Sequence, residues 1–517
     1  MSQLCLKREE KGIVIKMDCL LGIDIGTSSL KSLLINVEGN MLAVAAKEYF
    51  FDVPAVGYAE QDPAVWWNAL KDTVKEVMNR AGVTGEQIKG IGFSGQMHGL
   101  VALDKDLRPV RKAILHCDVR SEKQCKEIEM LFPEKGLSKV VLNPVFPGMQ
   151  MVSLLWMREN EPKIYEQVRH ALCPKDYMRL LLTGELGSER TDASATLAYD
   201  NNKQCWALDE LKKLEIDVEL FAPTNFTPYD KAGEVSGDAA KETGLQAGTP
   251  VAYGGGDQAM QSVGNGLYEP GNMTATIGTS GQVMYITQNP IYNESLNTHV
   301  FCHVFKDTWF ALAAVLNAGI TLNWFRKNFT PELTYEKMSQ LAQTIAPGSS
   351  GLAFFPAMMG ERTPYLDANT RGLFLGVSFV HTNAHFIRAI MEGVALEMKS
   401  GIDILMEMYS EPEYIYAVGG AAKSSVWLQI QADIYAKTLC VKQTEEQACT
   451  GAAIMAGIAS GLYADLKEGC TVAVSKEVRF VEPSSENTKV YTEFYNDVFR
   501  HLYDNNIELM RRLTKFD

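Results

Sequence analysis

The chain has 517 residues and a net charge of −14, with 49 lysines and arginines against 63 aspartates and glutamates. Since a single hydrophobic core stops growing at about 250–300 residues, this length predicts two domains. An acidic protein lacks the positive field that attracts nucleic acids and anionic membranes, so we expect neither as a partner. A phosphorylated small molecule is still compatible with the charge, because a few local backbone amides can hold phosphate.

Cysteine usage and the N-terminal composition favour a cytoplasmic protein. The ten cysteines show no CxxC pair and no metal-ligand spacing, which is typical of reduced thiols. No apolar run reaches the length of about 18–20 residues that a membrane span needs. Polar residues dominate the first 16 positions, so we expect residues 1–17 to be a flexible extension. Whether Met17 is the true start stays open.

A β-hairpin is predicted at the start of the ordered chain. Two β-rich runs between residues 19 and 40 flank the turn residues Thr27, Ser28 and Ser29. Such a turn exposes amides and hydroxyls that can surround phosphate oxygens, and Asp24 at the strand end can hold a cation or its water shell. A plain β-turn with a surface aspartate is the alternative interpretation, since short Gly-Ser motifs also occur by chance.

A second strand with a polar end follows. Asp62-Pro63 is a helix-start signal for an amphipathic helix to Ala81. The buried run at residues 88–93 is then a strand that ends in Ser-Gly-Gln-Met-His-Gly at 94–99. Polar residues framed by glycines between two strands are typical of a small-ligand site. A lone histidine such as His98 is more often structural than catalytic, so only the residues around it can favour a role at a ligand.

Two charged pairs come next, and each has a structural and a functional interpretation. Asp118 and Arg120 end the strand expected at residues 113–120, where they contact hydroxyls or pair with each other. Lys175 and Asp176 open an apolar helical segment, and we expect them to cap it or to pair.

The sequence is organised around residues 251–281, where a buried apolar run breaks into three glycines followed by Asp257. Because glycine has no Cβ and tolerates positive φ, the backbone beside Asp257 can approach a ligand closely. Residues 276–281, Thr-Ile-Gly-Thr-Ser-Gly, repeat the pattern Ile-Asp-Ile-Gly-Thr-Ser of residues 23–28. The repeat predicts two related halves with Asp257, a candidate base, at their junction. A loop-capping aspartate is the alternative.

The second half carries one more candidate ligand segment. The patterns predict helices at 311–326, 382–406 and 485–502 and a short strand at 351–355. A strand at 414–418 leads into Gly-Gly-Ala-Ala-Lys-Ser at 419–424 and another helix. This junction is not a P-loop, which requires glycine where Ala422 stands. Small residues before a helix N-terminus still suit close approach of a nucleotide.

In this order the motifs resemble those of the FGGY carbohydrate kinases, from about residue 20 to about residue 503. The most specific parts are SGQMHG and the PKDY…LTGE segment. The resemblance implies an α/β, two-domain, actin-like and hexokinase-like (ribonuclease H-like) ATPase fold with ATP in the interdomain cleft. It implies one domain over 18–265, with the sugar site, the first phosphate loop and the catalytic aspartate. The other domain, over 266–517, would hold the second phosphate loop and the adenosine site.

The resemblance also implies an activity, which is ATP-dependent phosphorylation of a sugar with Asp257 as general base. D-xylulose, giving D-xylulose 5-phosphate, is the favoured acceptor. The alternatives are gluconate, another ketose, a polyol or a signalling sugar, or a sugar-binding actin-like protein without kinase activity. Mg²⁺ is implied together with ATP, held by Asp24 and water. The oligomeric state stays open, with a homodimer as one option.

Individual residues acquire roles only through this resemblance. It places Gln96, Met97, His98 and Gln258 with Asp257 at the sugar, Asp24, Gly26, Thr27, Ser28, Gly278, Thr279 and Ser280 at the phosphates, and Gly419, Gly420 and Ala421 at the adenosine. The chain has His116-Cys117-Asp118 where the family commonly has Trp-Asn-Asp, and Tyr365 where it has histidine. These departures bear on the choice of sugar more than on the reaction.

Overall fold

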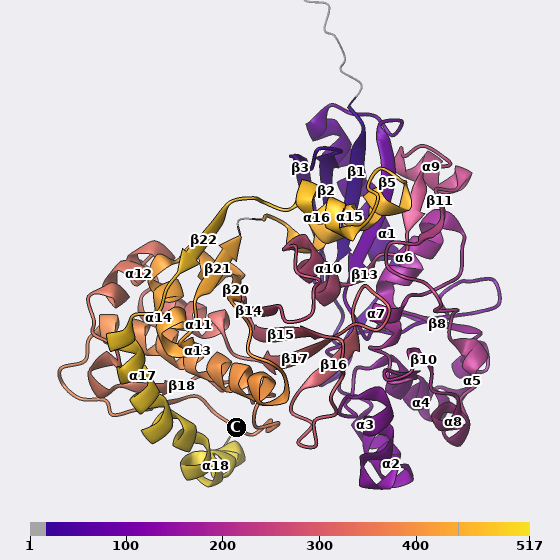
Figure 1. Cartoon of the computed structure of the whole chain (residues 1–517). Helices are drawn as coiled ribbons and strands as arrows, with labels where there is room; N and C mark the ends of the chain where they lie inside the picture. The colour runs from indigo at the N-terminus through magenta and orange to yellow at the C-terminus, as the bar shows by residue number, and fades with distance from the viewer. Residues whose placement is uncertain (1–16, 443, 517) are drawn as a thin grey trace, which may run out of the picture.

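The chain folds into two lobes, each organised around a seven-stranded mixed sheet (Figure 1). The computed structural model describes residues 17–442 and 444–516. The flexible extension predicted for residues 1–17 therefore falls, except for Met17, outside the described residues. The predicted two-domain α/β fold is confirmed.

The first sheet has the strand order β11-β12-β5-β1-β2-β3, with β13 paired to β5. β1, β2 and β3 form an antiparallel meander, while β5 lies parallel to β1. β12 lies parallel to β5, and β11 is antiparallel to β12. The bounds are β1 Cys19–Ile25, β2 Ser29–Asn36, β3 Met41–Glu48, β5 Ile88–Gly95, β11 Lys231–Glu234, β12 Pro250–Ala252 and β13 Gly255–Gly256. The hairpin predicted around the Gly-Thr-Ser turn is β1–β2.

The second sheet repeats this plan. Its order is β16-β17-β15-β14-β20-β21-β22, in which β14, β15 and β17 form the meander and β20 lies parallel to β14. β21 continues parallel to β20, and β22 is antiparallel to β21. The bounds are β14 Met273–Ile277, β15 Gly281–Thr287, β16 His299–Cys302, β17 Trp309–Val315, β20 Ile415–Val418, β21 Leu439–Lys442 and β22 Val478–Val481. The predicted relation between the two halves is therefore present in the topology.

Helices cover both sheets. α1 begins at the predicted signal, where the Asp62 side chain accepts a hydrogen bond from the backbone N–H of Ala64. The main helices are α1 Pro63–Ala81, α2 Glu122–Leu131, α4 Gln150–Asn160, α6 Pro174–Thr183, α9 Gly237–Thr243, α10 Asp257–Gly264, α11 Gly319–Phe329, α12 Tyr335–Gln343, α13 Asn383–Met408, α14 Ser425–Tyr435, α15 Gln447–Ala459, α16 Leu466–Ala473, α17 Ser485–Asp497 and α18 Leu502–Leu513. Short helices are α3 Gly136–Val141, α5 Pro162–Tyr165, α7 Arg190–Ala193 and α8 Leu208–Lys213. Minor strands are β4 Glu60–Gln61, β6 Val101–Leu103, β7 Ala113–Ile114, β8 His170–Leu172, β9 Tyr199–Asp200, β10 Cys205–Trp206, β18 Ala353–Phe355 and β19 Leu373–Leu375.

The late helices α15 and α16 lie with the first lobe, where Figure 1 shows them in orange beside the indigo strands. α15 is rich in small residues and packs closely on β1 and β5. A Cβ added at Gly22 or Gly92 would lie 1.9 Å from a backbone carbonyl oxygen of this helix. Chain order and spatial grouping therefore differ for α15 and α16. We retain the boundary at residues 265 and 266 as a proposal for where the chain passes from one sheet to the other.

Two predicted helices were wrong in extent. The segment 311–326 is the end of β17 followed by α11, because β17 pairs on both edges and is buried on both faces. A continuous apolar run of this kind cannot be told from a buried helix by periodicity. The terminal helix predicted at 485–502 ends at Asp497, and the chain turns before α18.

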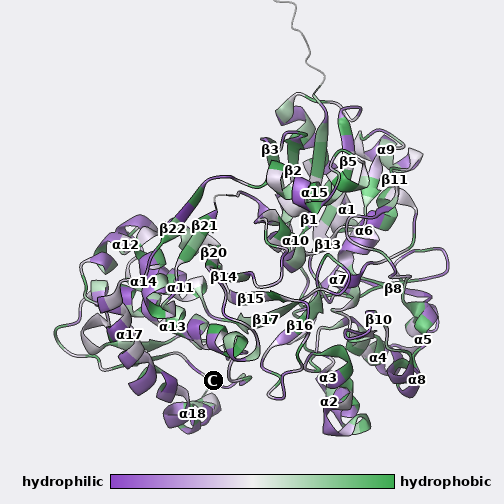
Figure 2. Ribbon diagram, viewed as in Figure 1, coloured by the Kyte–Doolittle hydropathy of each residue, from purple (hydrophilic) through white to green (hydrophobic). Residues whose placement is uncertain are grey.

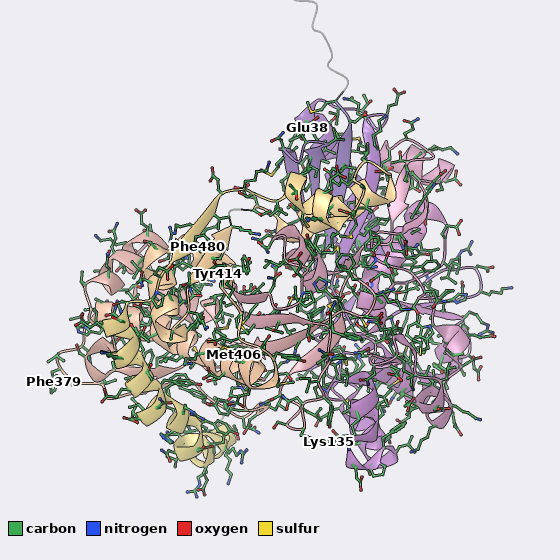
Figure 3. The ribbon with its side chains drawn as sticks, in the orientation of Figure 1. Glu38, Lys135, Phe379, Met406, Tyr414 and Phe480 are labelled. Carbon is green, nitrogen blue, oxygen red and sulfur yellow. The ribbon has the colours of Figure 1, made fainter. Side chains whose placement is uncertain are left out.

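Apolar residues concentrate on the sheet interiors, which appear green in Figure 2. Each sheet contributes its own buried cluster, and further clusters lie beneath α4 and α15. Phe379 is a fully exposed exception on the loop before α13, and it points outward from the second lobe (Figure 3). In the described part of the chain, no helix combines the length and the apolar character required to cross a membrane.

Candidate active site

The first predicted turn lies beside the polar end of β5. β1 and β5 run parallel with Asp24 opposite Ser94, so their carboxyl ends meet at one edge of the sheet. Ser94 Oγ donates a 2.7 Å hydrogen bond to Asp24 Oδ1. Burial raises the pKa of Asp24, and the Ser94 hydrogen bond opposes that rise. Asp24 is thus a half-buried carboxylate fixed by one oxygen at the sheet edge.

Gln96 holds the first turn, at Gly26 and Thr27, through two hydrogen bonds. Its side chain is buried and accepts a 3.3 Å hydrogen bond from Thr27 Oγ1 while donating a 3.4 Å bond to the Gly26 carbonyl. Tyr49 Oη donates a further bond of 2.7 Å to the same carbonyl. Ser28 at the tip of the turn is exposed. The predicted phosphate turn is therefore held by side chains that face inward and leaves its outer surface free.

Met97 and His98 continue from β5 toward the elbow at Gly256. Met97 is buried, and a Cβ added at Gly256 would lie 2.8 Å from Met97 Cγ. His98 has φ +73° and lies with Nδ1 2.7 Å from the Ala195 carbonyl oxygen. Since a carbonyl only accepts, Nδ1 carries the proton and Nε2 is left as an acceptor. Burial lowers the pKa of His98 to about 3, so the ring is neutral at physiological pH.

Gly254 and β13 form the elbow that presents Asp257. Gly254 has φ +71°, and a Cβ there would lie 2.0 Å from the Phe93 carbonyl oxygen, so only glycine fits. β13 pairs in parallel with the end of β5. Asp257 is the first residue of α10 and is half-buried. It therefore lies at the same sheet edge as the first turn, and the passage to the second lobe comes after α10, at residues 265–272.

Asp257 is electrostatically tuned by its surroundings. Burial raises its pKa to about 7, the negative charge of Asp24 adds to that rise, and a hydrogen bond from the Gln258 backbone N–H opposes it. A carboxylate whose pKa lies near neutrality is suited to accept a proton from a hydroxyl. The charge of Asp24 therefore acts directly on the ionisation of Asp257.

A buried cluster of five charged side chains lies beneath the elbow. Lys175 Nζ donates a 2.7 Å hydrogen bond to Asp176 Oδ1 and lies 3.3 Å from Asp192 Oδ2 and 3.5 Å from Glu189 Oε1. Arg179 completes the cluster, and all five side chains are inaccessible to solvent. Burial raises the pKa values of Glu189 and Asp192, most strongly that of Asp192. The cluster therefore places three carboxylates around two cations in the interior.

The cluster is bonded to the elbow backbone. Lys175 Nζ donates a 3.2 Å hydrogen bond to the Tyr253 carbonyl. The Gly256 N–H donates a 2.8 Å bond to Thr191 Oγ1, and that hydroxyl in turn donates a 2.7 Å bond to Glu189 Oε1. The peptide before Asp257 is therefore fixed through Thr191 to a charged group in the interior. The pairing predicted for Lys175 is confirmed.

Asp118 and Arg120 follow the structural alternative. Arg120 donates through Nε and Nη2 to the Asp118 carboxylate, at 2.9 and 2.7 Å. Asp118 Oδ2 also accepts a 2.6 Å bond from the Ala59 N–H, and the Arg120 guanidinium stacks 3.9 Å above the Tyr58 ring. Both groups are fully engaged within the protein.

The second predicted turn occupies, in its own sheet, the place of the first. Gly278 N–H donates a 3.0 Å hydrogen bond to the Ser280 carbonyl, which closes the β14–β15 connection. The Gly319 and Ile320 N–H groups at the start of α11 donate to the Gly278 and Thr279 carbonyls, at 2.9 and 3.1 Å. Thr279 and Ser280 are exposed. The turn therefore presents hydroxyls outward while its carbonyls anchor it.

The predicted adenosine segment follows β20, next to this turn. Gly419 has φ +88°, and a Cβ there would lie 2.5 Å from the Ile277 carbonyl oxygen. The chain then makes one 3₁₀ turn and enters α14, where Ser424 Oγ accepts a 3.2 Å bond from the Trp427 N–H. Small residues and a glycine with positive φ thus let β14 and β20 end close together.

A cavity of about 770 Å³ opens between this segment, the second turn and α12. Gly278, Thr279, Gly420 and Ala421 line it, whereas Ser280 and Gly419 do not. Its volume is in the range of small-ligand sites, about 300–1,000 Å³. Backbone at two glycine-rich loops and the start of α14 suit the phosphates and ribose of a nucleotide. The residues present therefore fit ATP.

The fit to Mg²⁺ rests on Asp24. Among residues 17–442 and 444–516, no group of three or more His, Cys, Asp or Glu side chains is placed to form a metal cage. Mg²⁺ is usually bound by one or two carboxylates together with substrate phosphates and water. A single half-buried carboxylate beside the first turn agrees with that mode of binding.

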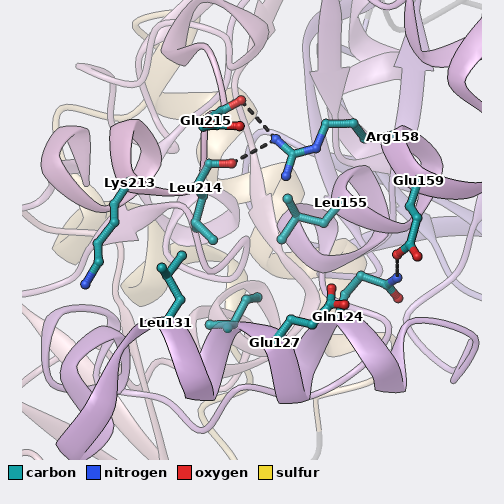
Figure 4. Close-up of a pocket in the computed structure, with 10 residues that line it drawn as sticks. Gln124, Glu127, Leu131, Leu155, Arg158, Glu159, Lys213, Leu214 and Glu215 are labelled. Carbon is teal, nitrogen blue, oxygen red and sulfur yellow. Dashed lines mark hydrogen bonds between the residues drawn. The ribbon is translucent and has the colours of Figure 1, made fainter.

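A second cavity, of about 490 Å³, lies outside this site (Figure 4). It is bordered by α2, α4 and the end of α8, and Arg158 crosses it to donate to the Leu214 and Glu215 carbonyls at 2.8 and 3.0 Å. None of the residues predicted for the site lines it. It is a cleft between helices of the first lobe rather than part of the candidate active site.

Sequence reasoning missed residues of two kinds. The cavity side chains from α11 and α12 belong to no motif and are Asn323, Tyr335, Ser339, Gln340 and Gln343. Glu189 and Asp192 were not identified as counter-charges for the cations of α6. A signal was present, because three charged residues within the apolar run 174–183 require buried counter-charges.

Comparisons with known proteins agree with the geometry. Sequence profiles described as the N-terminal and C-terminal domains of the FGGY family of carbohydrate kinases match residues 19–264 and 273–460. A xylulose kinase of Staphylococcus epidermidis is 35% identical over 486 residues, covering 94% of this chain and 96% of its own. The crystal structure of a "xyloylose kinase" from Brucella ovis has a TM-score of 0.87 at 30% identity, covering 95% of this chain and 100% of its own. A gluconate kinase from Lactobacillus acidophilus shares the fold, with a TM-score of 0.89 at 24% identity and 97% and 100% coverage.

Proposed function

Because the chain belongs to the FGGY family of carbohydrate kinases, we propose that it transfers the γ-phosphoryl group of ATP to D-xylulose, yielding D-xylulose 5-phosphate and ADP. The choice of sugar is supported by relatives that span nearly the whole chain and are named xylulose kinases. The gluconate kinase structure, at lower identity, supports the fold alone.

Asp257 carries the proposed chemistry. It stands at the start of α10 with a pKa near 7, beside Asp24 and at the edge where the first turn ends. In the proposed reaction its carboxylate accepts the proton of the terminal hydroxyl as the oxygen attacks phosphorus. Phosphoryl transfer depends mainly on positioning and charge stabilisation, so one oriented carboxylate supplies the acid–base part.

The remaining residues are proposed to position the two substrates. Met97, His98, Gln96 and Gln258 would border the sugar. The first turn, at Gly26, Thr27 and Ser28, and the second, at Gly278, Thr279 and Ser280, would hold the phosphates, with the adenosine at Gly419, Gly420 and Ala421. Asp24 would hold Mg²⁺ through water, and the metal would supply positive charge to the phosphate oxygens.

Closure of the two lobes is part of the proposal. The base lies at the edge of the first sheet and the nucleotide cavity at the edge of the second. Bringing the lobes together would place the γ-phosphate at the hydroxyl and exclude water, which limits hydrolysis of ATP.

The test is a sugar panel in a coupled assay for ADP release, with the phosphosugar identified by mass spectrometry. D-xylulose is expected to give the highest kcat/KM, against D-ribulose, D-gluconate, xylitol and glycerol. Higher turnover of another sugar would defeat the choice of substrate while leaving the kinase chemistry in place. ADP release without any phosphosugar would defeat both.

A further inference from the structure

Arg362 is a cation of the second lobe that reaches rings of the first. It lies on the loop after β18, which is anchored to the second sheet because Thr363 N–H donates to the Ala314 carbonyl at 2.9 Å. Its guanidinium carbon lies 5.2 Å from the centre of the Phe146 ring. Phe146 belongs to the segment before α4, in the first lobe. The loop therefore presents a positive charge across the boundary between the lobes.

The surface that Arg362 faces is aromatic and uncharged. The Phe146 ring centre lies 6.0 Å from that of His98 and 5.5 Å from that of His299, and Phe301 lies 5.6 Å from His98. Burial lowers the pKa values of His98 and His299 to about 3, and the charge of Arg362 adds to both shifts. Both histidines are therefore neutral.

Within residues 17–442 and 444–516, no carboxylate lies close enough to this guanidinium to form an ion pair, although the charge of the neighbouring Glu361 acts on it. Glu361 is adjacent in sequence, but its Oε1 accepts bonds from the Leu316 and Arg362 N–H groups at 2.7 and 2.8 Å. Its Oε2 faces Asn317 Nδ2 at 3.5 Å. A half-buried arginine without an ion pair is unusual, since buried charges are normally paired. Arg362 thus has donors available for a ligand.

The same rings adjoin the proposed sugar position. His98 follows Met97, which packs beneath Gly256, the residue before Asp257. His98 Nδ1 is committed to the Ala195 carbonyl, so Nε2 can only accept. A ligand between His98 and Arg362 must therefore offer a hydroxyl to the first and an acceptor oxygen to the second.

We propose that Arg362 determines the substrate class by donating hydrogen bonds to the carbonyl oxygen of an open-chain 2-ketose whose terminal hydroxyl lies at Asp257. This inference rests on the proposed function. In a 2-ketopentose, the 5-hydroxyl is the atom that closes the furanose ring onto C2. Only the open-chain form has both a free 5-hydroxyl and a C2 carbonyl, so an arginine at that carbonyl selects the reactive form.

The test compares Arg362→Gln with the wild type on D-xylulose and on xylitol, which carries a hydroxyl in place of the carbonyl. A charge-assisted hydrogen bond lost from the complex is expected to lower kcat/KM for D-xylulose by about 10- to 100-fold. The KM for ATP and the kcat/KM for xylitol should change by less than about threefold. Arg362→Lys, which keeps the charge, should recover part of the loss.

Lys213→Gln serves as the matched control, because it also removes a cation from above a ring, 4.4 Å from the centre of Phe132, on the border of the separate cavity of Figure 4. It should leave both sugars unaffected. Equal losses on D-xylulose and xylitol in Arg362→Gln would assign Arg362 a structural role, and no loss would exclude contact with the sugar. Either result overturns the inference.

The wild-type arm separates this inference from the proposed function. Turnover of D-xylulose by the wild type supports the function whatever Arg362→Gln does. If the wild type prefers D-gluconate, which has no C2 carbonyl, both the choice of D-xylulose and the reading of a 2-ketose carbonyl by Arg362 fail. If the wild type turns over D-xylulose and Arg362→Gln loses activity on D-xylulose and on xylitol equally, the inference fails and the proposed function stands.

Discussion

The two halves of the molecule share one scaffold and use it differently. In each half, two antiparallel strands are joined by a Gly-Thr-Ser turn, as β1–β2 and as β14–β15. A third strand, β5 or β20, lies parallel to the first strand of that pair. In the first half the parallel strand β5 meets the elbow before Asp257, which rests on buried charges. In the second half β20 meets a glycine-rich junction that borders an open cavity of about 770 Å³.

The two sites differ in the kind of groups that form them. The Asp257 side depends on two half-buried carboxylates, Asp24 and Asp257, above a fully buried cluster of charged side chains. The nucleotide side is made largely of backbone, glycines and exposed hydroxyls. Buried charges are costly unless they are paired, whereas backbone amides at a loop carry no such cost. The first half should therefore respond to loss of charge, and the second to loss of close backbone approach.

The largest expected effect comes from Asp257→Asn. Loss of a general base is expected to lower kcat by about 10²- to 10⁴-fold, while the KM for ATP stays near that of the wild type. The coupled assay for ADP release measures both. Asp238→Asn, an exposed carboxylate on α9, is the control. Near-normal turnover by the Asp257 variant would remove it from the chemistry.

The next effect concerns the cluster beneath the elbow. Lys175→Met removes one of two cations among three buried carboxylates. Breaking such a network typically costs about 3–5 kcal/mol of the free energy of unfolding. Thermal unfolding should therefore shift down by several degrees.

The matched control is Lys241→Met, which breaks the exposed pair with Asp238. An exposed ion pair of this kind contributes little, so the melting temperature should barely move. If Lys175→Met lowered the melting temperature no more than Lys241→Met, the buried charges would not stabilise the first half. The contrast between the two halves would then fail.

Much of this contrast could be read from the sequence, and part of it could not. The turns, the elbow and the junction at Gly419 are local, and glycine and polar residues after apolar runs identify them. The cluster and Arg362 join segments distant in the chain, so only folding brings them together. Strand β17 was mistaken for helix because every residue in Trp309–Val315 is buried, which erases the alternation that marks a strand.

A smaller effect is expected on the nucleotide side from Gly419→Ala. The new Cβ would lie 2.5 Å from the Ile277 carbonyl at a residue with φ +88°, so the junction must shift. The KM for ATP should rise by about tenfold while the KM for the sugar does not change, because a strained backbone residue costs about 1–3 kcal/mol. Gly420→Ala is the control, since its nearest neighbour, the Ile277 carbonyl, lies 4.0 Å away. Equal effects of the two variants would remove close approach as the explanation.

The smallest effect is a gain in stability in the variant that loses the most activity. The pKa of Asp257 is raised from 3.8 to about 7 in the folded protein, so ionisation is disfavoured there relative to the unfolded chain. The destabilisation is absent below about pH 4, grows as pH rises from about 4 to 7, and is complete above about pH 7. Asp257→Asn avoids this penalty, so it should be more stable than the wild type by about 1–3 kcal/mol at pH 8 and by less at pH 5. Thermal unfolding at both pH values measures the difference, with Asp238→Asn as the control that should show no such gain. If the difference in stability between Asp257→Asn and the wild type did not change with pH, the ionised Asp257 carboxylate would not be the cause of the destabilisation. The first half would then not be giving up stability to keep its base.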